Sequence, residues 1–321
     1  MRNLLIIGLF LASIGFYLPA QVYALAAPPP LWDDNFGGEL RQLTGCDDCE
    51  QRIPLRFPFP FNGNTYSTAY VGTNGCIQLA GLGLDEEIDY DYWQYMEEFL
   101  SDSDPDNPII CPIDTDWDLS TNGKVYYNSR TNPAVITWYK IGTNEDEETM
   151  SSFQALLYVD GTIVFNFNGI LDGPDQDLID DLDDGIVVGV TPSDLPWNGE
   201  PFVPGDPGPV DLNQGVFNFG PTAYERWCYD DADSCGVDGE DTGLPGPEND
   251  EFDLDFQSVC FTPQNGEFEI ISAAAGNTTL TCGGGELVVD IPTLSEWGMM
   301  AMAGVLGLVG FMAIRRKKLT A

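Results

Sequence analysis

The chain has 321 residues, of which 52 are acidic and 12 basic, and its formal net charge is −40. All the acidic residues lie between Asp33 and Glu296, so this central part repels nucleic acids, which excludes them as partners, and attracts cations. The chain contains no histidine, which excludes Ser-His-Asp and Cys-His catalytic groups and the H-E-x-x-H zinc site. A glycosidase that uses two carboxylates stays open as an alternative. No carboxylate pair stands out, and we predict a protein without catalytic residues or an enzyme activity.

Residues 1–24 have the pattern of a signal peptide. A single basic residue precedes an apolar core from Leu4 to Phe16, and small residues follow at cleavage positions, with Val22 and Ala24 or Ala24 and Ala26 as the pairs. A retained N-terminal anchor is the alternative. In both cases we expect the rest of the chain to be exported.

All eight cysteines follow this segment, and four disulfides are the default in an oxidising compartment. Cys228 and Cys235 lie in one loop and could close a local bridge. Cys46 and Cys49 form a C-x-x-C pair, for which a redox pair or half of a zinc site are the minor alternatives. The pairing stays open, because eight cysteines can be joined in many ways. The disulfide candidates are Cys46, Cys49, Cys76, Cys111, Cys228, Cys235, Cys260 and Cys282.

Residues 25–54 are expected to form an extended lead-in that starts with the proline-rich segment APPPLWDD. Between residues 55 and 271, short segments rich in β-branched and aromatic residues alternate with turn signals. Because strand follows strand at short spacing, we predict a mostly-β fold, an antiparallel β-sandwich with long acidic loops. The strand segments are expected within residues 64–79, 123–128, 134–142, 152–168, 185–191, 215–220, 255–263 and 267–271.

Two tight turns are expected inside these segments. Asn74-Gly75 favours the positive φ angles of a turn between two strands. Asp160-Gly161 predicts a two-residue hairpin loop with Tyr158 opposite Ile163. This register places five apolar side chains on one buried face. They are Leu156, Tyr158, Ile163, Phe165 and Phe167.

Helical spacing is found in DYDYWQYMEEFL. It predicts a short helix or capping loop that packs over an edge of the sandwich. The alternative is a platform for sugar binding that includes Trp93, because aromatic rings beside acidic groups can bind sugars. The spaced residues are Tyr92, Tyr95, Met96 and Phe99.

Four motifs within residues 55–192 resemble the nidogen-type extracellular domain: an S-T-N-G-like turn, a P…D.D strand, a V-T-W-like strand and an FQ..L..DG...F.F hairpin. The chain departs from this pattern at Cys76, where an aromatic residue is usual, and at Asn168-Gly169, where tyrosine is frequent. The family occurs in extracellular adhesive and matrix-associated proteins, so the resemblance implies such a role and carries over no catalytic residue. The four motifs lie at Gly72–Gly75, Pro112–Asp116, Ile136–Trp138 and Phe153–Phe167.

The segment DTDWDLSTNG places Asp114, Asp116 and Asp118 at alternate positions. On a strand they would project from one face, and in a loop they could converge on Ca²⁺, which prefers oxygen ligands. The EF-hand pattern is not met, because Leu119 stands where that loop requires glycine. Ca²⁺ is thus the one cofactor that we consider, and a solvated acidic surface is the alternative.

Residues 272–290 are expected to form a flexible spacer, although Cys282 would tie it to the domain if bridged. The apolar run of residues 298–314 predicts one transmembrane helix, since 17 residues make about 25 Å of helix. Trp297 suits the interface on the outer side. Four basic residues suit the cytoplasmic side and place the acidic domain outside: Arg315, Arg316, Lys317 and Lys318.

A plain anchor does not require the polar motif IPTLSEWG that precedes this run. Pro292 bars regular helix there and favours an extended segment that a membrane-embedded peptidase could bind. Motif, apolar span and basic end, residues 291–318, resemble the IPTL-type C-terminal sorting signal of Gram-negative bacteria. The resemblance implies recognition by an exosortase-like transpeptidase. The matching residues are Ile291, Pro292, Thr293, Leu294, Trp297 and Gly298.

The sequence therefore predicts an exported, non-enzymatic protein that is first anchored at the inner membrane and then sorted to the cell surface or the extracellular matrix. An adhesive or structural role is expected there, with exopolysaccharide or another surface protein as the partner. A carbohydrate- or calcium-binding module and a carboxylate-based glycosidase are the alternatives.

Overall fold

The computed structural model describes residues 29–80, 108–130, 132–143, 150–170, 186–192, 210–227, 252–274 and 282. These residues form strands and turns without any helix. No helix capable of crossing a membrane is found among them. The predicted signal peptide, the segment of residues 92–99 and the predicted membrane helix 298–314 lie outside the described residues.

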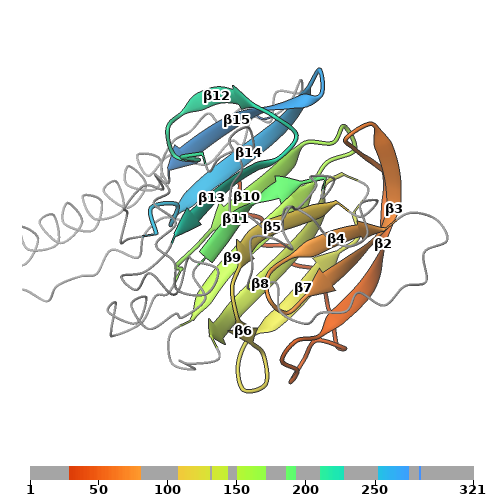
Figure 1. The fold of residues 1–321 in the computed structure, drawn as a ribbon. Coiled ribbons are helices and arrows are strands. Elements are labelled where there is room, and N and C mark those ends of the chain that lie inside the picture. Colours follow the sequence, from red (N-terminus) through yellow and green to blue (C-terminus); the bar gives the residue numbers. More distant parts are fainter. Residues whose placement is uncertain are drawn as a thin grey trace, which may run out of the picture.

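The strands form two antiparallel sheets, which confirms the mostly-β, antiparallel prediction (Figure 1). In the larger sheet, β6 (Trp117–Asp118) pairs with β8 beside the main path. That path is β1 (Gly38–Glu39), β7 (Lys124–Asn128), β8 (Ala134–Thr143), β9 (Ser151–Leu157), β10 (Ile163–Phe167), β14 (Gln257–Gln264), β15 (Glu267–Ala274) and β12 (Val216–Phe219). The smaller sheet has the order β13 (Ala223–Trp227), β11 (Ile186–Thr191), β5 (Ile109–Asp114), β4 (Ile77–Ala80), β3 (Asn64–Gly72) and β2 (Glu50–Phe61).

Strand β2 shows how the sequence positions its strands. Buried and exposed side chains alternate along it, as expected for a strand with one face on a core. Its three prolines have no N–H to donate to a ladder, which suits its position at the edge of the smaller sheet. β1 and the first residues of β2 lie within residues 25–54, the range expected to be an extended lead-in. The buried residues of β2 are Ile53, Leu55, Phe57, Phe59 and Phe61.

Side chains from both sheets form one buried apolar cluster. Near its centre, the rings of Trp138 and Phe153 are stacked with centroids 5.1 Å apart, and Trp117 lies 5.5 Å from Phe153. Trp138 on β8 also donates a hydrogen bond from its indole N–H to the carbonyl of Gly72 on β3, at 3.0 Å. This buried bond joins the two sheets directly, and it fixes how β8 of one sheet lies against β3 of the other.

The hairpin of β9 and β10 has a different register from the predicted one. Ile163 lies opposite Leu157, and the amide of Gly161 donates to the carbonyl of Tyr158 at 2.9 Å. With this register the loop has three residues, and not the predicted two. Its last residue is Gly161, whose φ of 88° is in the left-handed region. The shift of one residue moves Leu156 and Tyr158 to the other face of the sheet, where they belong to a smaller apolar cluster. The core face carries Phe153, Ala155, Leu157, Ile163, Phe165 and Phe167.

Three disulfides join described cysteines. Cys76–Cys111 is buried and joins the residue before β4 to the adjacent strand β5 of the smaller sheet, and Cys46–Cys49 closes a short loop. Cys260–Cys282 ties residue 282 to β14. The remaining two cysteines, Cys228 and Cys235, lie outside the described residues.

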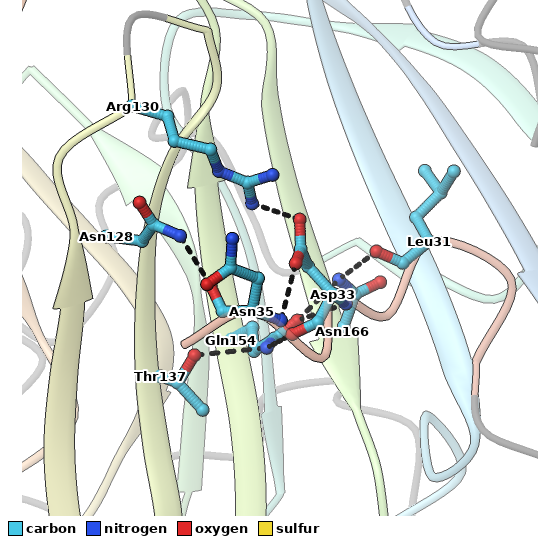
Figure 2. Close-up of polar contacts among 8 residues, drawn as sticks. All are labelled: Leu31, Asp33, Asn35, Asn128, Arg130, Thr137, Gln154 and Asn166. Carbon is cyan, nitrogen blue, oxygen red and sulfur yellow. Dashed lines mark hydrogen bonds and ion pairs between the residues drawn. The ribbon is translucent and has the colours of Figure 1, made fainter. Parts of the chain in front are cut away.

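Residues 29–36 run across the outer face of the larger sheet (Figure 2). Beneath them, four buried polar side chains form a row across β8, β9, β10 and β14, because their residues are partners in the strand register. We call this set the polar row. It consists of Thr137, Gln154, Asn166 and Ser258.

The polar row satisfies the backbone of the N-terminal segment. The Gln154 side-chain oxygen accepts the Asp33 N–H at 3.0 Å, and its NH₂ donates to the Asp33 carbonyl at 2.7 Å. Leu31 is held in the same way, because its N–H donates to Ser258 and its carbonyl accepts from Asn166, at 3.1 and 2.9 Å. Arg130 adds an ion pair with Asp33. Each side chain of the row thus gains partners that a buried polar group requires.

The buried disulfide Cys76–Cys111 of the smaller sheet is expected to stabilise the fold more than the disulfide Cys46–Cys49. It closes a loop of 35 residues in sequence separation, against three for Cys46–Cys49. Loop-closure entropy then predicts a loss of about 4 kcal/mol in the free energy of unfolding for Cys76→Ala with Cys111→Ala, and about 2 kcal/mol for Cys46→Ala with Cys49→Ala. Urea denaturation of both double variants measures this difference, and equal losses would contradict it.

Loss of one member of the polar row should release the N-terminal segment. Asn166→Ala leaves the Leu31 carbonyl and the Ser258 hydroxyl without their buried partner, so we expect the free energy of unfolding to fall by about 2–3 kcal/mol. Amides of residues 31–35 should also lose protection from hydrogen exchange. The matched control is Asn128→Ala, which removes a more exposed bond to the Asn35 carbonyl and should cost less than about 1 kcal/mol. Similar losses in both variants would contradict a special role of the row.

Candidate functional site

The loop closed by Cys46–Cys49 docks on the turn between β3 and β4. The Thr73 hydroxyl accepts the Cys49 N–H at 3.0 Å, and the Thr73 N–H donates to the Cys49 carbonyl at 2.8 Å. Gly75, with a φ of 89°, packs so closely on β5 that a Cβ would overlap the carbonyl oxygen of Ile113. The turn predicted at Asn74-Gly75 is therefore confirmed, and it brings the cysteine loop beside the segment that follows β5.

Acidic side chains from these two segments come together there. Asp47, Asp48 and Asp116 each offer a carboxylate oxygen, and these oxygens lie within 4.8 Å of one another. Asp48 accepts a hydrogen bond from the Asn74 amide at 3.0 Å, and its φ of 37° is in the left-handed region. Oxygen atoms in such a group are ligands that Ca²⁺ accepts. We call these three residues the loop cluster.

The charges of the loop cluster act on one another. Burial, followed by the charges of Asp48, Asp118 and Asp116, raises the pKa of Asp47 to about 6 from an ordinary value of 3.8. The Oδ1 atom of Asp47 is buried and has no hydrogen-bond partner among the described residues. The cluster therefore favours either a proton or a cation near neutral pH.

The structure separates the three aspartates that the sequence places at alternate positions. β5 ends at Asp114 in the smaller sheet, whereas β6 pairs with β8 of the larger one, so the segment crosses between sheets. Asp116 lies with the loop cluster, and Asp118 accepts two hydrogen bonds from Ser120. Asp114 is buried beside the Cys76–Cys111 disulfide, whose sulfurs are not free to bind a metal.

A second acidic group was not singled out in the sequence. It consists of Asp211, Glu225 and Asp253, with oxygens again within 4.8 Å of one another. Glu225 is the signal that the sequence offers for this group. It lies between Tyr224 and Trp227 in a short strand and is buried, and charged residues are seldom found at buried positions. That strand, β13, was also absent from the expected segments. The predicted sugar platform and sorting motif lie outside the described residues.

Comparison with known proteins identifies the class of protein. Residues 23–190 match the family model described as NIDO related, and because this match spans more than half of the 321 residues, the chain belongs to the NIDO-related family. The match begins well before residue 55 and so includes the N-terminal segment and β1. Residues 291–316 match the IPTL-CTERM motif. Both matches confirm the resemblances that the sequence motifs indicate.

A more distant relative supports the same class. Over 136 residues the chain is 27% identical to nidogen-2 of Mus musculus. The aligned part covers 42% of this chain and 8% of the length of nidogen-2. No solved structure matches the chain.

These matches give the general role of the protein. The IPTL-CTERM motif indicates a surface protein that is sorted by an exosortase, and the NIDO-related domain indicates an extracellular or cell-surface location. Neither family is enzymatic.

The raised pKa of Asp47 predicts a pH-dependent stability. The folded state binds more protons than the unfolded state between about pH 4 and 6, so the free energy of unfolding should fall as the pH rises through this window. Asp47→Asn removes this loss and should add about 1 kcal/mol at pH 7, since solvent screens a partly buried carboxylate, with little effect at pH 3.5. Denaturation of the wild type and of this variant at both pH values, in the presence of EDTA, measures the change in the free energy of unfolding. The exposed Glu267→Gln is the control, and the same pH profile in both variants would contradict the assignment.

Proposed function

We propose that the protein is an adhesive or structural component of the cell surface or extracellular matrix, delivered there by an exosortase-like transpeptidase. The observation that carries the proposal is the IPTL-CTERM match at residues 291–316. The match begins just before the apolar run of residues 298–314 and extends into the basic residues that follow it. The chain is exported by its signal peptide, and the apolar run anchors it at the inner membrane until it is processed.

The described domain suits such a location. Its disulfides are the kind that persist in oxidising compartments outside the cytoplasm. Its acidic surface repels anionic lipid headgroups and keeps the domain soluble in a medium that contains salt. The adhesive or structural role rests on the NIDO-related family, whose resemblance implies extracellular adhesive and matrix-associated proteins. Exopolysaccharide or another surface protein is the partner that we propose.

The tether between domain and motif is short. Cys282 is joined to Cys260 on β14, and residues 283–290 separate it from Ile291. An extended chain of this length reaches about 30 Å. Before processing, the domain would therefore lie close to the membrane, within reach of the sorting enzyme. Cleavage at the motif would release this constraint and allow the domain to move to its final location.

Processing should depend on the motif itself. Pro292→Ala together with Trp297→Ala removes the extended conformation and the interfacial aromatic residue, so we expect full-length protein to accumulate in the membrane fraction of the native host. Intact-mass analysis and immunoblotting of membrane and surface fractions measure the outcome. Leu287→Ala with Val288→Ala, two apolar changes just upstream of the motif, is the matched control and should be processed normally. Unchanged processing of the motif variant would refute the proposed sorting.

A further inference from the structure

Three carboxylates from separate segments meet at one end of the two sheets. Asp211 lies in the turn before β12, Glu225 lies in β13 of the smaller sheet, and Asp253 lies just before β14 of the larger one. Each offers an oxygen, and these oxygens are within 4.8 Å of one another. We call this group the sheet-end cluster. It lies outside residues 23–190, so the match to the NIDO-related family does not account for it.

The burial of Glu225 sets this group apart from an ordinary acidic surface. Its side chain is 0% exposed, and Val188 of β11 is its partner in the strand register. One carboxylate oxygen, Oε2, accepts the Leu212 N–H at 2.8 Å. The other, Oε1, is buried without a hydrogen-bond partner among the described residues. An ionised carboxylate in such a place is costly unless it is paired.

Asp253 has the same deficit. Its Oδ1 atom is buried without a partner within the described part of the chain, while Oδ2 lies 3.4 Å from the amide nitrogen of Asn213. The two ion pairs formed by described residues, Lys124–Glu39 and Arg130–Asp33, are both elsewhere. Two carboxylate oxygens of this cluster therefore have no donor in the part of the chain that the structure describes. They need either protons or a cation.

The electrostatics of the cluster also favour a proton or a cation at these oxygens. Burial raises the pKa of Glu225 to about 8, although the hydrogen bond from Leu212 lowers it, and the charges of Asp253 and Asp211 raise it further. Burial also raises the pKa of Asp253. A divalent cation would neutralise these charges and supply the partner that the unpaired oxygens lack. The ligands are all oxygens, which suits Ca²⁺ rather than a transition metal.

We propose that Asp211, Glu225 and Asp253 bind a Ca²⁺ ion. Asn213 is placed to add its side-chain oxygen, because rotation of the amide by 180° exchanges the oxygen with the nitrogen that now faces Asp253. Water molecules would complete the coordination, because Ca²⁺ binds about six to eight oxygen atoms. The exposed position of Asp211 leaves the site open to solvent on that side.

The ion would tie the two sheets together. Asp253 is followed by β14, Glu225 belongs to β13, and Asp211 precedes β12, so one ion would hold segments of both sheets. Next to the cluster, Phe252 packs against Trp227 of the smaller sheet and Phe167 of the larger one, at 4.7 and 5.5 Å between ring centroids. Binding energy at such a position contributes to folding, which makes the stability of the domain depend on external Ca²⁺.

Thermal unfolding of the full-length protein in detergent tests the proposal. Ca²⁺ at about 100 times its Kd should raise the Tm by about 5–10 °C over NaCl of equal ionic strength. Glu225→Gln keeps an oxygen for the Leu212 N–H but removes the charge. We expect this variant to have a higher Tm than the wild type in EDTA, and to show no Ca²⁺-specific increase. If Glu225 is protonated and only structural, the Glu225→Gln variant would show the same Ca²⁺-specific increase as the wild type. That result would overturn the proposal.

A second variant covers the case in which Glu225→Gln does not fold. Asp211→Asn is an exposed change that keeps the oxygen accepting the Asn213 N–H, and it should weaken Ca²⁺ binding at least about 10-fold by isothermal titration calorimetry. Asp116→Asn in the loop cluster is the matched control and should keep the wild-type affinity. Loss of binding in Asp116→Asn with retention in Asp211→Asn would place the ion at the loop cluster and refute the sheet-end site. Equal Tm shifts from Ca²⁺ and NaCl would refute both.

Discussion

The fold depends on satisfying polar groups that are buried on the outer face of the larger sheet. In an antiparallel two-sheet protein this face would ordinarily be wet, and polar side chains on it would bond to water. Here Gln154 and Asn166 are fully buried, so each needs a partner from the protein. The backbone of Leu31 and Asp33 supplies those partners, and the side chains supply the partners of that backbone. The polar row and the N-terminal segment depend on each other, because separating them would leave buried polar groups of both without hydrogen-bond partners.

This dependence involves both ends of the described chain. The N-terminal segment begins only a few residues after the predicted signal peptide, and the family match from residue 23 includes it. On the same outer face, Leu31 packs in a small apolar cluster with Cys260 and Cys282. Both ends of the described chain are therefore held on one side of the domain.

Electrostatics set a second constraint. With a formal net charge of −40, the folded chain holds acidic groups near one another, and repulsion opposes the compact state. In most places solvent and salt reduce that repulsion. The loop cluster and the sheet-end cluster differ, because each contains carboxylate oxygens that are buried without a hydrogen-bond partner in the described residues. The loop cluster forms where a loop meets the segment after β5, whereas the sheet-end cluster includes Glu225 in the middle of the edge strand β13.

The sequence by itself determined the mostly-β class, the turn at Asn74-Gly75 and the sorting signal, because each follows from local patterns. Alternation of apolar residues, an Asn-Gly pair and a short motif need no knowledge of distant contacts. Only the tertiary structure decided the hairpin register, since Asp160-Gly161 is compatible with loops of two or three residues. The burial of Ala155 and Leu157, in place of Leu156, on the core face selects the loop of three.

The same reason explains the sites. Asp114, Asp116 and Asp118 are close in sequence, but the chain crosses between sheets there, and Asp116 lies instead with Asp47 and Asp48. Asp211, Glu225 and Asp253 are far apart in sequence, and only the packing of β13 beside the start of β14 brings their oxygens together. The burial that gives Glu225 its unusual chemistry, like the cover over the polar row, comes from segments that no local pattern connects. Local patterns fix which elements form, whereas contacts between distant segments decide which side chains lose their water.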